Sequence, residues 1–485
     1  MERELRFRLN NRLVEIRDRE EIVVLDWLRR EQGLTGTKEG CREGDCGACM
    51  VLMGEHDPQS GAVTWKGALS CLLALGELDG RHIVTIEGIG KQGLTPVMEA
   101  MLDEGASQCG FCTPGFVVSL TAYLLCGGKL TVDGATRAIE GNLCRCTGYG
   151  SIQRAAAHLV ERFGSLPESM GERIAELSRS GVIPGEIASS MMDLPAPASS
   201  GQAAAPERQG AVLTLGGGTD YFVRNPDPAP LGEVAFVDRE PGLRRITEAN
   251  GIITLGASVS VQDFFESTIV RSAFPGIEQY EGDFASLPIR TRATLAGNIT
   301  NASPIGDMTS VLLALRATVR IRTSAGGRAG SRMLPLDQYF LSYRTTSLEA
   351  GESVEALLVK VPSGQARTSF NFEKVSKRKH LDIASANSAC LASADANGVI
   401  SEIALSAGGV GPVPMRLRKT EGYLLGKSID AETARKAASL AAAECTPIDD
   451  VRGRASYRRT LLSRFIWAHL IRLAPERDLA KELLA

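Results

Sequence analysis

Eight of the eleven cysteines fall into two sets of four, and their spacing is typical of metal or cluster ligation. The first set has a C-x4-C-x2-C core and a distant fourth member: Cys41, Cys46, Cys49 and Cys71. This is the plant-type [2Fe–2S] spacing. Gly40, Gly44 and Gly47 free the backbone to wrap closely around a cluster and to aim N–H groups at its sulfides. Structural zinc usually takes paired C-x2-C knuckles, so the set predicts a [2Fe–2S] cluster, with zinc as the alternative.

The second set combines a C-x2-C pair with a C-x-C pair: Cys109, Cys112, Cys144 and Cys146. Spacing alone leaves zinc open here. The dipeptide Thr113-Pro114 predicts a helix that begins just after Cys112, with Thr113 as its N-cap. Free N–H groups and the helix dipole at that end favour anionic thiolates, so we expect a second cluster. The remaining cysteines are expected to be packing residues: Cys126, Cys390 and Cys445.

The composition excludes several classes of protein. With 485 residues, the chain is long enough for about three domains of ~100–200 residues each. Its 54 basic and 57 acidic side chains give a net charge of −3, which argues against nucleic acid as a partner. No apolar run approaches the ~18 residues of a membrane span, and the charged stretch Met1–Arg6 is unlike a signal peptide. We therefore expect a cytoplasmic protein without a membrane partner, whose thiols stay reduced.

Local patterns predict the elements that position the cysteines. Residues 3–17 alternate apolar and polar side chains around Asn10-Asn11, which predicts a hairpin. A helix over 24–32 and strands over 50–53 and 63–66 complete a small mixed sheet around the first set. After Thr95-Pro96 the pattern becomes helical, and four helices are expected: one from residue 96, then 114–125, 131–140 and 151–163.

Beyond residue 210 two loops of small residues stand out. Val212–Asp220 predicts a strand that runs into three consecutive glycines. The pattern is not G-x-G-x-x-G, so a Rossmann fold is not expected. The glycines nevertheless permit close approach to a pyrophosphate, and a plain glycine turn is the alternative. Ala293–Asp307 supplies a second such loop, rich in Asn, Thr, Ser and Asp.

The two cysteine sets and their flanks resemble the iron–sulfur half of the molybdenum hydroxylases. The matching segments are Gly44–Cys49, Gln108–Gly115 and Gly141–Tyr149. The resemblance implies two [2Fe–2S] clusters, one in a ferredoxin-like β-grasp domain and one in a four-helix bundle. It also implies that the first cluster lies nearer a flavin and the second nearer molybdenum.

The second half of the chain resembles the FAD-binding part of the same family. By position, Phe284 matches the family's aromatic over the isoalloxazine, Asp307 an acid near the adenosine portion, and Tyr343 a residue of the nicotinamide site. For Phe284 and Tyr343 taken singly, a place in the core is the alternative. Ser385 stands where some relatives have a lysine near the flavin. The basic residues Lys374, Lys377, Arg378 and Lys379 are expected to form a solvated charged surface, with assistance in phosphate binding as the alternative. The FAD-binding residues implied by the resemblance are Thr214, Leu215, Gly216, Gly217, Gly218, Thr219, Asp220, Tyr221, Phe284, Thr294, Gly297, Asn298, Thr300, Asp307, Tyr343 and Ser385.

The predicted architecture is therefore α+β and multidomain. The expected parts are a ferredoxin-like domain at 1–88, a helical [2Fe–2S] domain at 89–165, and a Pro- and Ala-rich linker at 166–209. An α/β FAD-binding domain of the molybdenum-hydroxylase type follows at 210–365, and a C-terminal α+β flavoprotein domain at 366–485. Helices are expected in this last part near 431–444 and 457–473.

Together these sites imply electron transfer between one-electron clusters and a two-electron flavin. No residues remain for a molybdopterin domain, so a partner subunit is expected to carry molybdopterin and hydroxylation, with no residue of this chain catalysing that step. The fusion of clusters and FAD resembles the small subunit of xanthine dehydrogenases, with NAD⁺ as acceptor, urate as the product of hypoxanthine or xanthine, and an (αβ)₂ assembly. The alternatives are a hydroxylase of aldehydes, CO or N-heterocycles, or a zinc-stapled scaffold without redox function.

Overall fold

The chain divides into two compact units in the computed structural model, which describes residues 4–17, 19–57, 59–198, 213–226, 234–323, 330–362, 367–395 and 397–484. Unit 1 contains the described residues up to 198, residues 213–226 and 234–239, and the short segment 286–289. Unit 2 contains residues 240–285 and the described residues from 290 onward. No described helix is both long enough and apolar enough to cross a membrane.

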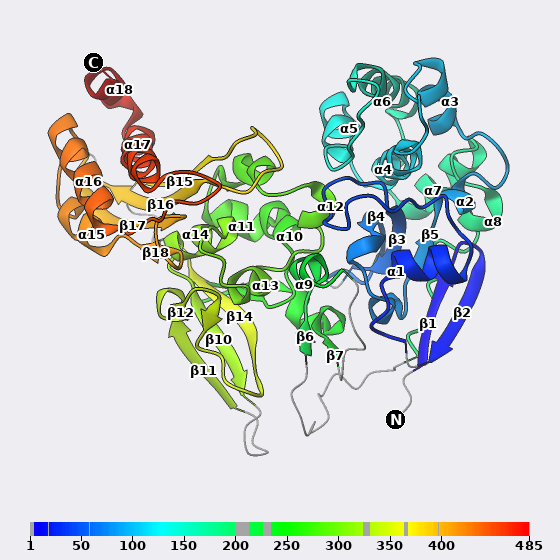
Figure 1. The fold of residues 1–485 in the computed structure, drawn as a ribbon, viewed down its shortest axis with the longest axis horizontal. Coiled ribbons are helices and arrows are strands. Elements are labelled where there is room, and N and C mark those ends of the chain that lie inside the picture. The colour runs from blue at the N-terminus through cyan, green and yellow to red at the C-terminus, as the bar shows by residue number, and fades with distance from the viewer. Residues whose placement is uncertain are drawn as a thin grey trace. The chain divides into compact units, whose positions relative to one another are not determined.

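Unit 1 begins with a five-stranded mixed sheet in the order β2-β1-β5-β3-β4 (Figure 1). Its strands are β1 (Glu4–Leu9), β2 (Arg12–Arg17), β3 (Met50–His56), β4 (Val63–Leu69) and β5 (His82–Val84). Alternate residues of β1 are buried, and Asn10 turns the β1–β2 hairpin with a φ of +53°. Helix α1 (Val24–Asp26) continues into a π-helical turn, η1 (Trp27–Glu31). The predicted β-grasp domain is confirmed.

Four helices follow and confirm the predicted bundle: α3 (Pro96–Asp103), α4 (Thr113–Leu125), α5 (Val132–Ala138) and α6 (Gly150–Phe163), after the short α2 (Ile86–Ile89). The Thr95 hydroxyl accepts a hydrogen bond from Met98 N and caps α3, as the sequence predicts. Helix α4 is buried along most of its length because almost all of its side chains are apolar or small.

Part of the stretch expected as a linker is helical. It contains α7 (Met170–Arg179) and α8 (Gly185–Ala188), and Ile174, Leu177 and Ile187 enter the same apolar core as the bundle. The fully buried Arg173 donates to the carbonyls of Leu124 and Gly128 at the end of α4. The prediction of a linker is therefore wrong for residues 170–188. Helix α7 buries its apolar face against the four-helix bundle. Residues 199–209 of the predicted linker lie outside the described residues.

A β-α-β segment also belongs to unit 1. Strand β6 (Leu213–Leu215) pairs in parallel with β7 (Val234–Phe236), and α9 (Thr219–Arg224) follows β6. A 3₁₀ turn, η4 (Val237–Arg239), ends the segment. Its apolar side chains, among them Leu215, Phe222 and Phe236, lie in one hydrophobic core with the residues around Cys49 and Cys71.

Unit 2 contains two larger sheets. The first has the order β11-β10-β14-β9-β8 and consists of β8 (Ile246–Ala249), β9 (Ile252–Gly256), β10 (Thr318–Thr323), β11 (Gly330–Pro335) and β14 (Glu352–Lys360). Its accompanying elements are α10 (Val261–Glu266), α11 (Thr268–Ala273), α13 (Leu295–Thr300), α14 (Asp307–Ala314) and the hairpin β12 (Phe340–Ser342) and β13 (Thr345–Thr346). The short α12 (Leu287–Arg290) lies mostly in the 286–289 segment of unit 1. One apolar core joins this sheet to α10, α13 and α14.

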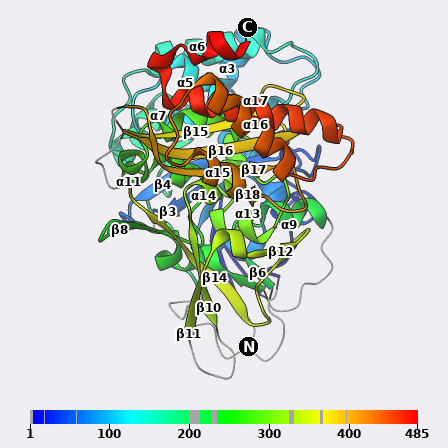
Figure 2. The ribbon, with the colours of Figure 1, turned by 90° about the vertical axis from the view of Figure 1, so that its left-hand side faces the viewer.

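The second sheet of unit 2 has the order β15-β16-β17-β18 (Figure 2). Its strands are β15 (Arg367–Val375), β16 (Ala386–Ala394), β17 (Ile400–Gly408) and β18 (Met415–Arg416), and its helices are α15 (Arg418–Leu424), α16 (Ala431–Glu444), α17 (Ala455–Leu473) and α18 (Leu479–Leu484). Helix α17 packs on β15 and β16, and α14 packs on β16 and β17. The two helices predicted near 431–444 and 457–473 are confirmed.

Candidate cluster and cofactor sites

The first four cysteines converge at one end of the β-grasp domain. Cys41, Cys46 and Cys49 lie on the loop before β3, and Cys71 lies in a 3₁₀ turn, η2 (Ser70–Leu72), after β4. The sulfurs form two pairs: Cys49 Sγ lies 3.3 Å from Cys71 Sγ, and the Cys41 and Cys46 side chains are hydrogen-bonded to each other. Within the described residues, no three His, Cys, Asp or Glu side chains are placed to hold one ion.

This pairing fits a binuclear cluster. Two sulfurs bound tetrahedrally to one metal at ~2.3 Å lie about 3.8 Å apart, so each pair is placed to hold one iron. Backbone N–H groups already point at the sulfurs, from Cys41 N to Cys46 Sγ (3.4 Å) and from Glu43 N to Cys41 Sγ (3.3 Å). The Cys46 side chain and the backbone N–H groups of Glu43, Asp45 and Cys46 lower the pKa of Cys41 to about 5. Gly44 and Gly47 allow the wrapped loop through positive φ angles of +80° and +66°.

The second four cysteines also form two pairs. Cys109 Sγ lies 3.7 Å from Cys146 Sγ, and the Cys112 and Cys144 side chains interact directly. Burial raises the pKa of Cys112 to about 12 in the absence of a metal. Thr147 donates to Cys144 Sγ from its hydroxyl (3.2 Å). The donors and their pairing fit a second binuclear cluster, with Cys109 and Cys146 exposed.

Helix α4 begins at the second site, as predicted, but its N-cap is Cys112. The prediction that Thr113 is the N-cap is wrong by one residue. The Thr113 hydroxyl instead hydrogen-bonds to Ser107 Oγ (2.8 Å) and fastens the loop that carries Cys109.

The two cysteine sites adjoin one another within unit 1. Leu143, the residue before Cys144, donates its N–H to the carbonyl of Cys46 at 2.9 Å. A ligand residue of the first site is thus one hydrogen bond from the neighbour of a ligand residue of the second. Spacing in the sequence carries no signal for this contact, because the two residues are far apart along the chain.

The glycine-rich loop of unit 1 adopts a conformation that only glycine accommodates. It joins β6 to α9, and Gly218 has a φ of +66°. A Cβ at Gly218 would lie 2.8 Å from the Phe222 ring, so the backbone must stay bare. Of the predicted residues, Thr214 and Asp220 are exposed, Leu215 and Gly217 are buried, and Gly216, Gly218, Thr219 and Tyr221 are intermediate.

Ion pairs and hydrogen bonds fasten this glycine-loop segment to the β-grasp domain. The guanidinium of Arg42, next to Cys41, donates to the carbonyl of Pro226 (2.8 Å) just after α9. Buried Arg81 pairs with Glu55 (2.9 Å) of β3 and with Asp238 (2.8 Å) after β7. The glycine loop therefore lies in the same compact unit as the first cysteine site. Neither arginine was identified from the sequence, because single charged residues carry no local signal for a distant partner.

The second predicted loop lies in unit 2, and most of its polar side chains hold the loop itself. Thr294 caps α13 by accepting from Gly297 N (3.0 Å). Asn298 Oδ1 accepts from Thr309 N and Oγ1 (3.2 and 3.0 Å). Thr300 Oγ1 is hydrogen-bonded to Tyr339 OH (3.1 Å). Much of the loop's backbone is also hydrogen-bonded within the protein, for example Asn298 N to the Thr294 carbonyl and Asn301 N to the Gly297 carbonyl (both 2.9 Å).

The β12–β13 hairpin comes close to the second loop. Arg344, with a φ of +54°, donates to Asn301 Oδ1 (2.9 Å) and lies beside the Tyr343 ring. Tyr343 is 58% exposed. The structure thus places the predicted nicotinamide-site residue next to the second loop, on an accessible surface of unit 2.

Phe284 is buried and Asp307 is half-buried in unit 2, and both contact β15. Phe284 stacks on Phe372 with ring centroids 5.0 Å apart. Asp307 pairs with Lys374 (2.7 Å) and accepts from Asn387 Nδ2 (2.6 Å), while burial raises its pKa. Lys374 Nζ also donates to the carbonyl of Asp283 (2.6 Å), the residue before Phe284.

Two predictions about this region change. Lys374 was expected in a solvated basic run, and that expectation is wrong, because its side chain is only 8% exposed and paired with Asp307. Ser385 is buried, and its hydroxyl donates to the carbonyl of Arg452 (2.9 Å). A hydroxyl bonded in this way holds the chain together and is not directed at solvent.

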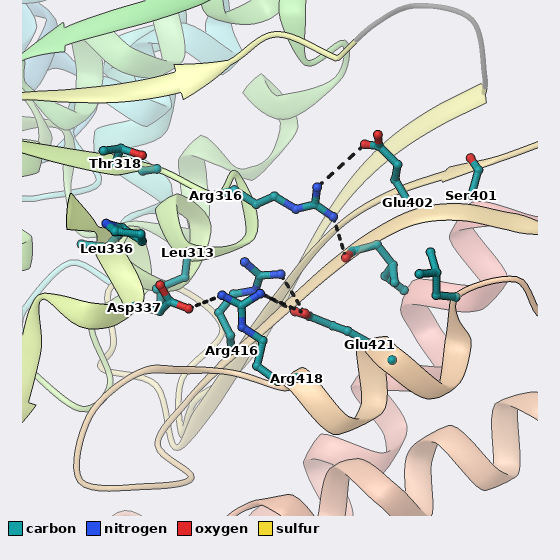
Figure 3. Close-up of a pocket in the computed structure, with 15 residues that line it drawn as sticks. Leu313, Arg316, Thr318, Leu336, Asp337, Ser401, Glu402, Arg416, Arg418 and Glu421 are labelled. Atoms are coloured by element: carbon teal, nitrogen blue, oxygen red, sulfur yellow. Dashed lines mark hydrogen bonds and ion pairs between the residues drawn. The ribbon is translucent and has the colours of Figure 1, made fainter. Parts of the chain in front are cut away.

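A separate cavity of about 680 Å³ lies in unit 2 among α14, β10, β17 and α15 (Figure 3). Three arginines and three acids line it, and they pair with one another: Arg416 with Glu421 (2.6 Å), Arg418 with Asp337, and Arg316 with Glu402 (3.9 Å). None of the residues predicted to bind a cofactor lines this cavity. The charges that line it are therefore paired with one another.

Comparison with known protein families assigns each part of the chain. Residues 7–75 match the 2Fe-2S iron-sulfur cluster binding domain and 85–157 the [2Fe-2S] binding domain. Residues 191–363 match the FAD binding domain in molybdopterin dehydrogenase, and 372–472 the CO dehydrogenase flavoprotein C-terminal domain. The predicted fold class is confirmed.

Characterised relatives include xanthine dehydrogenases and aldehyde oxidases. The chain is 28% identical to xanthine dehydrogenase of Blastobotrys adeninivorans over 92% of its own length and 39% of the relative. It is 27% identical to aldehyde oxidase 2 of Cavia porcellus over 97% of its own length and 40% of the relative. The chain thus spans about two fifths of the length of these relatives.

Solved structures with a related chain include a carbon monoxide dehydrogenase from Hydrogenophaga pseudoflava that lacks the Mo-pyranopterin moiety. That match has 28% identity, covers 53% of this chain and 86% of the other, and has a TM-score of 0.48. Quinoline 2-oxidoreductase from Pseudomonas putida 86 matches at 22% identity over 56% of this chain and 91% of the other, also with a TM-score of 0.48. On the family matches alone, the chain contains two [2Fe-2S] domains, an FAD binding domain of the kind described in molybdopterin dehydrogenase, and a CO dehydrogenase flavoprotein C-terminal domain.

Proposed function

We propose that this chain is the electron-transfer subunit of a xanthine dehydrogenase. In this proposal a partner subunit with molybdopterin oxidises hypoxanthine or xanthine to urate, and this chain delivers the electrons to FAD and then to NAD⁺. The bound clusters would supply one-electron steps and FAD the conversion to hydride transfer. The proposed assembly is an (αβ)₂ heterotetramer, and the proposed location is the cytoplasm, where eleven free thiols remain reduced.

One observation carries the proposal: the two cysteine sites are adjacent, and they differ in exposure. Cys109 and Cys146 of the second site are exposed, whereas Cys49 and Cys71 of the first are buried. Exposed Phe111 and Leu143 flank the second site, which gives a partner an apolar surface at the cluster. The first site shares a core with the glycine loop proposed to cradle FAD. Electrons entering at the second site would therefore pass toward the flavin.

The residues proposed to hold the groups follow from these contacts. Each cysteine set would hold one [2Fe–2S] cluster through its two sulfur pairs. The backbone of Gly216–Gly218 would bind the FAD pyrophosphate, and the 293–307 loop would bind other parts of FAD. Tyr343, which is exposed beside that loop, is proposed to line the NAD⁺ site.

Reconstitution with the molybdenum subunit tests the proposal. Xanthine should produce NADH with this chain present and should not do so without it. Normal reduction of an artificial dye without NADH formation would refute NAD⁺ as acceptor while sparing electron transfer. Cys109→Ser should leave FAD bound but stop its reduction by substrate, and unimpaired flavin reduction would refute the route through the second site.

A hydroxylase with another substrate is the second candidate. The chain is as similar to aldehyde oxidases as to xanthine dehydrogenases, and a substrate bound on the partner would leave these sites unchanged. Supplying the reconstituted complex with xanthine, an aldehyde and an N-heterocycle separates the candidates. Turnover of the aldehyde alone would refute the xanthine assignment.

A further inference from the structure

A buried amide joins the two cysteine loops. Asn142 lies two residues before Cys144 and is 2% exposed. Its Nδ2 donates to the Gly47 carbonyl (3.3 Å), and its Oδ1 accepts from the Ser119 hydroxyl (2.8 Å). Ser119 is itself buried on α4. One carboxamide therefore connects the helix that begins at Cys112 with the backbone directly after Cys46.

Bare glycine backbone allows the loops to come this close. A Cβ at Gly47 would lie 2.5 Å from Asn142 Nδ2 and 2.6 Å from the Gly141 carbonyl. A Cβ at Gly115 would lie 2.3 Å from the Gly47 carbonyl. The junction, which is the contact between the loop at Gly47 and the segment at Asn142, therefore leaves no room for a side chain at Gly47 or Gly115. Its geometry depends on the few polar groups that form hydrogen bonds across it.

We propose that Asn142 is a positioning residue for electron exchange between the two cluster sites, an inference that rests on the proposed function. The hydrogen bond from Asn142 to the Gly47 carbonyl fixes the loop at Gly47 and with it the orientation of the Cys46–Gly47 peptide. The Cys46 carbonyl therefore remains placed to accept from Leu143 N–H at 2.9 Å. Exchange moves one electron from one site to the other, with no bond broken and no proton moved. Its rate therefore depends on how firmly the two ligand loops are held together.

An isosteric substitution isolates this role. In Asn142→Asp the donor that faces the Gly47 carbonyl becomes an acceptor, so the contact turns repulsive while the volume is kept. Loss of a buried hydrogen bond with an unpaired carbonyl left behind should open the junction about tenfold more often. Ser119→Ala is the milder variant: it removes the group that orients the amide but leaves the donor, and about a threefold effect is expected.

Asn10→Asp is the matched control. Asn10 lies in the same unit on the β1–β2 turn, where Oδ1 accepts from Thr85 N (2.9 Å) and Nδ2 donates to Thr85 Oγ1 (3.3 Å). It undergoes the same chemical change away from the junction.

Two measurements on the full, cluster-loaded chain test the proposal. Amide hydrogen exchange at Leu143 should accelerate about tenfold in Asn142→Asp and about threefold in Ser119→Ala, with wild-type values in Asn10→Asp. Rapid one-electron photoreduction, followed by electron paramagnetic resonance, should show slower equilibration between the two clusters in the same order. Iron content and both cluster potentials, measured in every variant, separate coupling from cluster loss and from altered driving force.

Unchanged exchange and equilibration in Asn142→Asp, with normal iron content, would overturn the proposal. So would a slowing explained entirely by lost iron in both Asn142→Asp and Ser119→Ala. A wild-type chain that shows no iron–sulfur signals would overturn the proposed function and this inference together. Wild-type signals with unaltered variant kinetics would overturn the inference alone.

Discussion

The two cysteine sites have the same pairing of sulfurs but opposite surroundings. The first is formed by a loop and a turn folded against a sheet, and two of its cysteines are buried in an apolar core. The second lies at the end of a helix, with Cys109 and Cys146 exposed. Backbone N–H groups donate to the sulfurs of the first site, whereas at the second site Thr147 donates to Cys144 Sγ from both its hydroxyl (3.2 Å) and its backbone N–H (3.5 Å). The first site is thus packed into the hydrophobic core, whereas two cysteines of the second site are accessible from the surface.

The largest expected difference between the two sites follows from removing one cysteine from each. Cys71→Ser and Cys109→Ser should each lower the iron content from about four to about two per chain. Cys71 is buried in the core, so its substitution should also destabilise the β-grasp domain, whereas Cys109→Ser should unfold at nearly the wild-type denaturant concentration. Iron analysis and denaturant unfolding measure both effects. Equal destabilisation by the two variants would contradict the difference in burial.

Two glycines allow the packing of the two cysteine loops to be compared, because each adopts a positive φ inside one of the loops. Gly44 has a φ of +80°, and a Cβ there would lie 2.6 Å from Ile289 and 2.7 Å from Leu72. Gly110 has a φ of +82° and no neighbour within 4 Å. Gly44→Ala should therefore cost about 3 kcal/mol of unfolding free energy through strain and overpacking. Gly110→Ala should cost about 1 kcal/mol through backbone strain alone.

Denaturant unfolding of the two alanine variants measures these costs. A cost for Gly110→Ala equal to that of Gly44→Ala would show that the second loop is packed as tightly as the first.

One buried and one exposed histidine allow the two cysteine-containing domains to be compared through the pH dependence of stability. Burial lowers the pKa of His82, on β5 of the first domain, to about 4, whereas His158 of the second domain is exposed on α6. In the unfolded chain the His82 imidazole binds a proton below about pH 6.5. In the folded chain it binds a proton only when the pH falls to about 4. The stability from neutral His82 is therefore complete above pH 6.5 and is lost as the pH falls toward 4.

Between pH 7 and pH 5 this loss should be about 2 kcal/mol. Denaturant unfolding at both pH values should show a smaller pH dependence in His82→Gln, with His158→Gln as the control. If His82→Gln keeps the full pH dependence, His82 is not the group responsible.

The smallest expected effect concerns the hydroxyl at the second site. Thr147→Val removes the hydroxyl donor to Cys144 Sγ and keeps the backbone N–H donor of the same residue; the backbone donors of the first site also stay in place. Hydrogen bonds to sulfur favour the reduced cluster, so the potential of the second cluster should fall by about 40 mV, the equivalent of about 1 kcal/mol. Redox titration followed by electron paramagnetic resonance measures both potentials. An equal shift at the first cluster would mean that the sites are not independently tuned.

Local patterns in the sequence predicted the elements around both sites closely. The hairpin at 3–17 and the helix after Cys112 follow from alternation and from the Thr-Pro start signal, which depend on neighbours along the chain. The C-x4-C-x2-C spacing likewise reports a loop that wraps one group. Such signals need no knowledge of distant contacts, so the sequence was sufficient for them.

Contacts between distant residues could not be predicted in this way. Lys374 reads as one of several lysines and arginines, and only the fold places it on Asp307. The amphipathic helix at 170–179 was overlooked because the neighbouring prolines and alanines suggested a linker. The joining of the glycine-loop segment to the β-grasp domain depends on Arg81 and Asp238, 157 positions apart. Tertiary packing decides each of these, and no local pattern encodes it.

The metal and flavin content of the purified chain, together with its visible spectrum, tests the central claim most directly. Two [2Fe–2S] sites and one FAD predict a brown protein with about four irons, a matching amount of acid-labile sulfide and absorption beyond ~400 nm. A colourless protein that contains zinc in place of iron would contradict the electron-transfer function of both cysteine sites.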